Sequence, residues 1–295
     1  MTGVQTCALP ISLGVAHVLG ASKGFDLFID SDVPVGAGLS SSAAIECAVA
    51  LGLDELLGLG NDRRALARIG QRAENEVVGA PTGIMDQSAS LLGKVDHAVF
   101  LDCQTLAVEN IELGFAAAGL EVVIIDTRVA HRLNDGGYAT RRAACEAAAE
   151  AMGVAALRDA NLDMLAAAGL DAVTTSRARH VITENQRTLD AADALARDDL
   201  TTLGALMARS HASMRDDFEI TVPAIDELVA LLQRAIGPAG GARMTGGGFG
   251  GACVAVMPAA RVDKVRAAIS AEYKTPAGES PLIMVERPGP GVAIL

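Results

Sequence analysis

The chain has 295 residues, of which 51% are hydrophobic and 20% charged, enough to bury one large core or two smaller ones. Its net charge is -12 and Lys and Arg do not cluster, which excludes a surface that binds duplex nucleic acid. No apolar run reaches the length of a membrane span, and the first residues lack the basic start of a secretory signal.

The N-terminal part alternates between strand and helix patterns. Residues 25–33 alternate polar and apolar side chains as a strand does, and a Gly-rich turn follows. An Ala-rich helix is predicted next, with Ser hydroxyls at its start. The further elements predicted here are helices over 40–57, 62–78 and from about Ile84, and a hairpin of strands 97–103 and 106–111.

The C-terminal part is mostly helical and ends in mixed structure. A strand over 121–126 precedes four Ala-rich segments with apolar residues at helical spacing. Because strands and helices are interleaved throughout, the fold class is α+β, with a domain boundary near 115–120. The predicted helices are 139–152, 176–196, 199–213, 223–236 and 261–272, and the predicted strands are 251–257, 282–286 and 292–295.

The strongest local pattern is the segment 34–44, Pro-Val-Gly-Ala-Gly-Leu-Ser-Ser-Ser-Ala-Ala. Gly36 and Gly38 allow backbone to approach a ligand closely, and the helix N-terminus offers unpaired N–H groups and a positive dipole end. Together they predict a phosphate cradle without the Lys of a Walker A loop. The alternative is a Gly-rich turn with one Ser as helix cap, which does not explain three hydroxyls.

Two other segments carry chemistry. Residues 73–87, Ala-Glu-Asn-Glu-Val-Val-Gly-Ala-Pro-Thr-Gly-Ile-Met-Asp-Gln, place one carboxylate near a helix end and another at a new helix start. Two such acids can hold a metal and accept a proton, although an isolated pair would more often be solvated surface. Residues 243–253, Arg-Met-Thr-Gly-Gly-Gly-Phe-Gly-Gly-Ala-Cys, form an ordered Gly-rich loop before a strand.

These three segments, in this order, resemble the signature motifs of the GHMP kinase superfamily. The resemblance implies a two-domain α+β fold with the active site between the domains, and ATP and Mg²⁺ as cofactors. It makes Asp86 the catalytic base, and Glu74 with Ser42, among the Ser40–Ser42 hydroxyls, the Mg²⁺ ligands. The implied ATP- and phosphate-binding residues are Pro34, Gly36, Gly38, Leu39, Ser40, Ser41, Ser42, Ala43, Gly246, Gly247, Gly248 and Gly250.

Two segments resemble the galactokinase branch of the superfamily. Residues 126–142 end in Tyr-Ala-Thr-Arg-Arg, which implies that Tyr138 contacts the sugar together with Gly83 and Asp86. On its own, Tyr138 would be taken as an aromatic side chain packing near a helix start. Residues 211–223 also look like the C-terminal domain of that branch.

The start of the chain departs from the family pattern. The run Gly-Arg-x-Asn-Leu-Ile-Gly-Glu-His-x-Asp-Tyr, which supplies sugar-binding groups in galactokinases, is not found, so the first strands are expected to be missing. Residues 1–12 resemble the translation of a widely used DNA-sequencing adapter and are interpreted as a non-native leader. The expected domains are 13–117, a partial N-terminal domain, and 118–295, a C-terminal domain.

The implied activity is ATP-dependent phosphorylation of the anomeric hydroxyl of galactose, in a cytoplasmic monomer whose partners are sugar and ATP. Five cysteines without a CxxC spacing agree with buried free thiols in a reducing compartment. Alternatives are a kinase for N-acetylgalactosamine or arabinose, or a non-catalytic regulator that responds to sugar and ATP. The chain by itself is expected to be inactive, because groups that position the sugar are missing.

Overall fold

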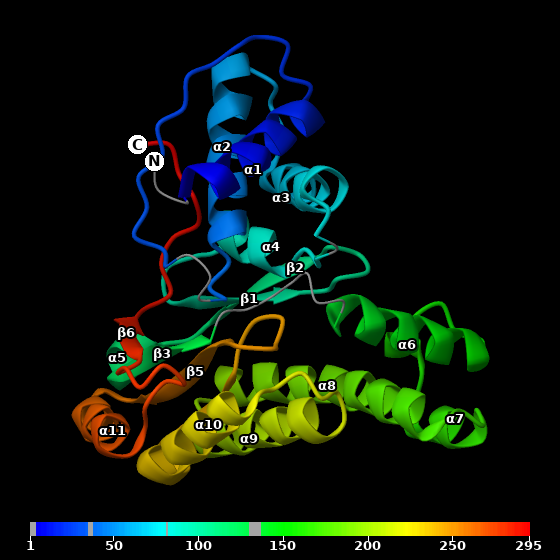
Figure 1. Cartoon of the computed structure of the whole chain (residues 1–295), viewed down its shortest axis with the longest axis vertical. Coiled ribbons are helices and arrows are strands. Elements are labelled where there is room, and N and C mark those ends of the chain that lie inside the picture. Colours follow the sequence, from blue (N-terminus) through cyan, green and yellow to red (C-terminus); the bar gives the residue numbers. More distant parts are fainter. Residues whose placement is uncertain (1–3, 35–37, 81, 130–136) are drawn as a thin grey trace. The chain divides into compact units, whose positions relative to one another are not determined.

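The computed structural model describes residues 4–34, 38–80, 82–129 and 137–295, which form two compact units (Figure 1). The first unit comprises Met1–Gly114 with Arg287–Leu295, and the second comprises Phe115–Glu286. The division falls beside the expected boundary, but the last residues of the chain belong to the first unit and not to the C-terminal one. None of the helices in these ranges combines the length and the apolar character that crossing a membrane requires.

The first unit is a group of helices with one hairpin. Apolar residues of four helices and of a π-helical turn form its core, which includes Val15, Cys47, Leu66 and Leu91. The elements are α1 (Val4–Leu19), α2 (Ser41–Leu57), α3 (Arg63–Arg72), the π-helical turn η1 (Ala73–Val78), α4 (Met85–Leu92) and the antiparallel strands β1 (His97–Leu101) and β2 (Val108–Glu112).

Helix α1 includes most of the predicted leader. Ile11 and Ser12 are buried, and α1 packs against α2 and η1. The approach to η1 is close, because a Cβ on Gly14 would lie 3.2 Å from the Cβ of Val77. Residues left out of the predicted fold therefore have a packed helical structure, while their non-native origin stays a prediction.

Two predicted strands are wrong. Residues 25–33 and 292–295 have no regular secondary structure. A strand needs a partner for its N–H and C=O groups, and no strand in the described ranges pairs with residues 25–33. Phe28, at an apolar position of that alternation, is 91% exposed. Near the chain end, the Val292 N–H instead donates to the Ser90 carbonyl.

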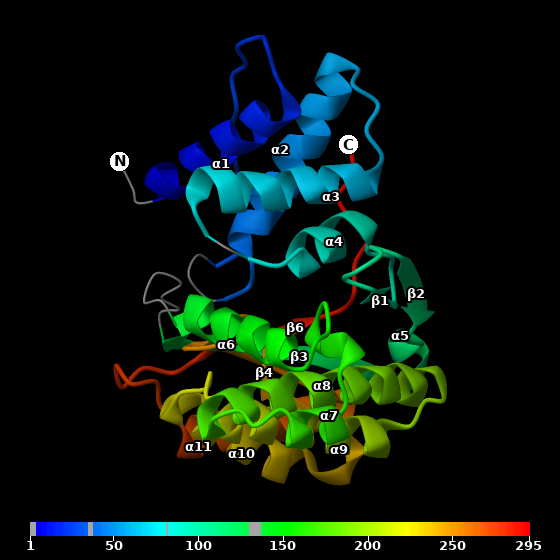
Figure 2. The same cartoon turned by 90° about the vertical axis from the view of Figure 1, so that its right-hand side faces the viewer.

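The second unit is a four-stranded antiparallel sheet with helices. Its strand order is β4-β5-β3-β6, and α9, α10 and α11 lie on one side of the sheet (Figure 2). The elements are α5 (Phe115–Ala118), β3 (Leu120–Val129), α6 (Gly137–Ala151), η3 (Leu157–Asp159), α7 (Leu162–Ala167), α8 (Ala172–Ala196), α9 (Leu200–Asp216), α10 (Pro223–Ile236), η4 (Gly237–Ala239), β4 (Gly241–Met244), β5 (Gly251–Pro258), α11 (Ala259–Glu272) and β6 (Leu282–Glu286).

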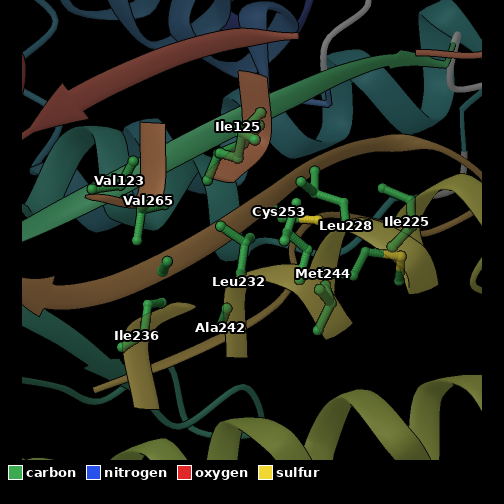
Figure 3. Packing of buried hydrophobic residues seen from close by; sticks show 14 of the residues in the cluster. Val123, Ile125, Ile225, Leu228, Leu232, Ile236, Ala242, Met244, Cys253 and Val265 are labelled. Atoms are coloured by element: carbon green, nitrogen blue, oxygen red, sulfur yellow. The ribbon is translucent and has the colours of Figure 1, made fainter. Parts of the chain in front are cut away.

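The core of the second unit lies between this sheet and α10. Ile225, Leu228 and Leu232 of α10 point toward Met244 of β4 and Cys253 of β5 (Figure 3). These residues recur at the helical spacing of the sequence, so the apolar stripe of α10 covers the sheet. The loop that contains residues 246–250 connects β4 and β5. Both of these strands are largely buried, so the sheet holds the two ends of the loop.

Candidate active site

The first turn of α2 has an unusual start. Gly38 has a φ of 70° and Ser40 a φ of 58°, which is rare for a residue other than glycine. Ser40 occupies the N-cap position, yet its side chain makes no capping hydrogen bond. Because the first N–H groups of a helix have no carbonyl ahead of them, this turn offers backbone donors to an anion. Gly36, also predicted in the cradle, lies outside the described residues.

The Ser40 hydroxyl contacts the predicted base instead of capping the helix. Its Oγ donates to Oδ2 of Asp86 at 2.5 Å, across 46 positions of sequence. Asp86 lies in the first turn of α4. A capping role for Ser40 is therefore wrong, and its strained backbone brings a hydroxyl of the predicted phosphate loop to the predicted base.

The second predicted acid is held by hydroxyl groups. Glu74 is 6% exposed and belongs to η1. Its Oε1 accepts a hydrogen bond from Ser42 Oγ at 2.9 Å, and its Oε2 accepts one from Thr82 Oγ1 at 2.7 Å. The structure thus places Ser42 and Glu74, the two predicted metal ligands, in direct contact.

A second layer lies beneath these groups. Gln87, which follows Asp86 on α4, donates from Nε2 to Glu46 Oε2 at 2.8 Å and to Glu74 Oε2 at 3.1 Å. Glu46 and Gln87 are both 0% exposed. Burial raises the pKa of Glu46 to about 8, against a lowering by Gln87, and nearby Glu74 and Asp86 raise it further.

Sequence reasoning missed Glu46, Gln87 and Thr82 as parts of this site. The available signal was a carboxylate inside the Ala-rich helix α2, four residues after Ser42 and therefore on the same face. By contrast, Glu76 is exposed and pairs with Arg72 at 2.8 Å.

The acids Glu46, Glu74 and Asp86 form what we call the carboxylate cluster. Within the described ranges, none of the three makes an ion pair with Lys, Arg or His. Also within those ranges, no group of three or more His, Cys, Asp or Glu is arranged to enclose a metal ion.

The Gly-rich loop between β4 and β5 is held within the second unit. Gly246, Gly248 and Gly250 have φ values of 80°, 88° and 135°, which Gly adopts without strain. A Cβ on Gly248 would lie 2.6 Å from the Ile220 carbonyl oxygen, and the Phe249 N–H donates to that oxygen at 2.6 Å. The loop is therefore docked on the segment after α9.

Arg141 of α6 supports the same loop. Its guanidinium lies 5.5 Å from the ring centroid of Phe249 and donates to the carbonyls of Phe218 and Glu219. The neighbouring Tyr138, predicted to contact the sugar, lies in α6, but its side chain is outside the described part. Gly83 has open space around it. Of the other residues in the predicted binding set, Gly247 is exposed, Pro34, Leu39 and Ser41 are half-buried, and Ala43 is buried near the start of α2.

Comparisons with known proteins identify the class to which this site belongs. The N-terminal domain of GHMP kinases matches residues 10–94, and the C-terminal domain matches residues 191–275. A crystal structure of Lactococcus lactis galactokinase complexed with galactose matches with a TM-score of 0.85 and 34% identity, over 95% of this chain and 75% of that one. The chain belongs to the GHMP kinase family, and the predicted fold is confirmed.

More distant structures share the fold alone. Homoserine kinase from Cytophaga hutchinsonii matches with a TM-score of 0.62 and 16% identity, over 97% of this chain and 76% of that one. L. major mevalonate kinase in complex with R-mevalonate matches with a TM-score of 0.59 and 17% identity, over 98% and 80%. The fold is thus common to several kinases and does not by itself identify the substrate.

Proposed function

We propose that the protein transfers the γ-phosphoryl group of ATP to the anomeric hydroxyl of galactose. The observation that carries the proposal is the pairing of Ser40 with Asp86 and of Ser42 with Glu74, which joins the predicted phosphate loop to both predicted acids. The 34% identity to a galactokinase supports galactose as the acceptor, because that structure holds the sugar.

Asp86 is the residue that acts on the acceptor hydroxyl. Its carboxylate would accept or orient the proton of the attacking oxygen, while the Ser40 hydroxyl fixes Oδ2. Phosphoryl transfer depends mostly on positioning and on charge stabilisation, so the contribution of Asp86 lies in alignment as much as in basicity.

Mg²⁺ would be held by the Ser42 hydroxyl and the Glu74 carboxylate. Their oxygens lie 2.9 Å apart and are joined by a hydrogen bond, so the two predicted ligands are next to each other. Mg²⁺ binds through oxygen atoms such as these. When bound, the ion would neutralise charge on the phosphates. The chain's own task is to hold these two oxygens in place.

The N-terminal turn of α2 would bind the phosphates through its backbone N–H groups. Gly38→Val should abolish nucleotide binding, because a branched side chain at a φ of 70° is strained and occupies the space next to the backbone. Calorimetry with a non-hydrolysable ATP analogue measures this. An unchanged affinity would mean that the loop is only a turn.

The activity is tested by formation of galactose 1-phosphate from ATP, Mg²⁺ and galactose. Two proteins are compared: the chain of 295 residues, and a fusion with the sugar-binding segment of Lactococcus lactis galactokinase ahead of residue 13. We expect product from the fusion and none from the chain by itself. Product from N-acetylgalactosamine or arabinose, but not from galactose, would mean that one of those sugars is the acceptor. Nucleotide binding without turnover of any of these sugars would favour a regulator.

A further inference from the structure

Glu46 and Gln87 have no role in the chemistry described so far, although both are completely buried beside it. Gln87 makes the only described hydrogen bonds that connect Glu46 to the rest of the carboxylate cluster. A buried carboxyl group is costly unless its partners compensate, so this arrangement calls for a reason.

The bonds divide the two oxygens of Glu74 between two tasks. Oε2 accepts hydrogen bonds from Thr82 Oγ1 and Gln87 Nε2. Oε1 faces Ser42 Oγ, on the side where the proposed Mg²⁺ ligands meet. One oxygen is thus anchored, which fixes the direction of the other.

Glu46 in turn anchors Gln87. The Gln87 amide has two N–H bonds, and they point to Glu46 Oε2 and Glu74 Oε2. The remaining oxygens of this pair, Glu46 Oε1 and Gln87 Oε1, are buried and have no hydrogen-bond partner. A proton on Glu46 would let the acid and the amide bond to each other in both directions, since an acid O–H can donate to the amide oxygen.

Helix α3 leaves room for this pair. Gly70 is buried in the middle of α3, where glycine is less favourable than alanine. A Cβ at this position would lie 3.2 Å from Gln87 Cγ and 3.5 Å from Glu46 Oε2. The glycine therefore gives space to these two side chains, which indicates that their placement is a built feature of the unit.

We propose that Glu46 is a positioning residue that, through its hydrogen bond with the Gln87 amide, holds the Glu74 carboxylate in the direction required for Mg²⁺. This inference rests on the proposed function. It assigns a role to Glu46 that depends on the groups facing it, which are Gln87 and Asp86 from α4, Glu74 from η1 and Gly70 from α3.

The test measures how Mg²⁺ strengthens the binding of a non-hydrolysable ATP analogue to the 295-residue chain. Gln87→Met removes both amide bonds at similar volume. We expect it to lower the strengthening by Mg²⁺ about tenfold, as changes behind metal ligands commonly do, and to leave affinity without Mg²⁺ unchanged. Thr82→Val, which removes the other bond to Glu74 Oε2, should act in the same way.

Two variants of Glu46 distinguish its hydrogen bonding from its volume. Glu46→Gln can still pair with Gln87 in both directions and should keep most of the Mg²⁺ effect, whereas Glu46→Leu should lose it. Glu76→Gln, on the exposed face of η1, is the matched control and should resemble the wild type. In case Glu46→Leu does not fold, Gln87→Met and Thr82→Val still test the anchoring of Glu74 Oε2.

Each outcome bears on one statement. A Mg²⁺ effect that is unchanged in Gln87→Met would overturn the inference while the proposed function stands. Equal losses of the Mg²⁺ effect in Glu46→Gln and Glu46→Leu would overturn the role of the hydrogen bond between Glu46 and Gln87. A wild-type chain that binds the analogue with no Mg²⁺ effect would overturn the proposed metal site and, with it, this inference.

Discussion

The two units surround their buried and half-buried acids with different partners. In the second unit, the half-buried Glu184 contacts Arg187 at 2.6 Å and Arg243 at 3.3 Å. Burial acts to raise the pKa of Glu184, but the Ser210 hydroxyl and the two arginines bring it below its ordinary value. In the carboxylate cluster of the first unit, the described partners are hydroxyls and one amide.

Under the proposed function, this difference separates a structural acid from acids that act at the site. An acid paired with arginines inside its own unit has its charge balanced and is part of the folded framework. Acids that gather without a cation repel one another, and they gain most from a cation that arrives with a ligand. The same residue type therefore has two roles, which the partners reveal and the sequence alone does not.

Asp86→Asn should give the largest effect. The amide keeps the contact with Ser40 but cannot accept the proton of the attacking hydroxyl, so turnover by the fusion protein should fall about 10³-fold, within the usual range for a general base. Nucleotide and sugar affinities should change by less than about threefold. Rapid-quench measurement of the first turnover checks the chemical step, and near-normal turnover would remove Asp86 from the mechanism.

The stability of the chain should depend on pH through Glu46. Its folded pKa, about 8, lies above the ordinary value of 4.5, because of burial and of the neighbouring Glu74 and Asp86. The folded state therefore binds the proton more tightly, and the stability present below pH 4.5 is lost as the pH rises toward 8. The expected loss between pH 5 and 8 is on the order of 3 kcal/mol, at about 1.4 kcal/mol per pKa unit.

Urea unfolding at several pH values measures this loss, and Glu46→Gln is its control. The variant should show a flatter pH profile over the same range, since it cannot titrate. If the two proteins lose stability in parallel, the pH dependence belongs to other groups.

Gly248→Ala tests the docking of the Gly-rich loop. Alanine would be strained at a φ of 88° and would meet the Ile220 carbonyl at 2.6 Å, so the free energy of unfolding should fall by about 2 to 3 kcal/mol. Gly83→Ala is the matched control, because that position has open space and an ordinary φ. Its stability should stay within about 0.5 kcal/mol of the wild type. Equal stabilities of the two variants would mean that the loop can shift away from the Ile220 carbonyl at little cost.

Glu184→Gln tests the acid of the second unit in this comparison. It should lower the stability by about 1.5 kcal/mol, since the arginines lose their partner while keeping some exposure. It should leave the Mg²⁺ effect on nucleotide binding unchanged. A loss of that effect would show that Glu184 takes part in binding, contrary to the distinction drawn above.

The sequence predicts those elements that satisfy their own backbone groups. Helix α10 was predicted over 223–236 and is found over Pro223–Ile236, because Pro at the first position and a steady apolar spacing mark it locally. The hairpin of β1 and β2 is also local. Residues 25–33 show the limit, because an alternating pattern cannot tell whether a partner strand exists.

The same limit applies to the candidate site. Asp86, Glu74 and Ser42 could be found because they stand in motifs of characteristic order. Glu46 has only a weak local signal, its position four residues after Ser42, because its contact with Gln87 spans 41 positions and its surroundings include Gly70 of another helix. Contacts between helices depend on how the helices pack, which the pattern of one segment does not encode.

The return of the chain end to the first unit has a consequence for biosynthesis. Gly291 bonds to Gly93, Val292 bonds to Ser90, and Arg63 donates to the Val292 carbonyl at 2.6 Å. These bonds lie near the end of α4, the helix whose first turn contains Asp86. All of residues 115–286 must therefore be synthesised before this helix receives its last contacts. The acids of the first unit are synthesised early, but the packing of the helix that contains Asp86 is completed late.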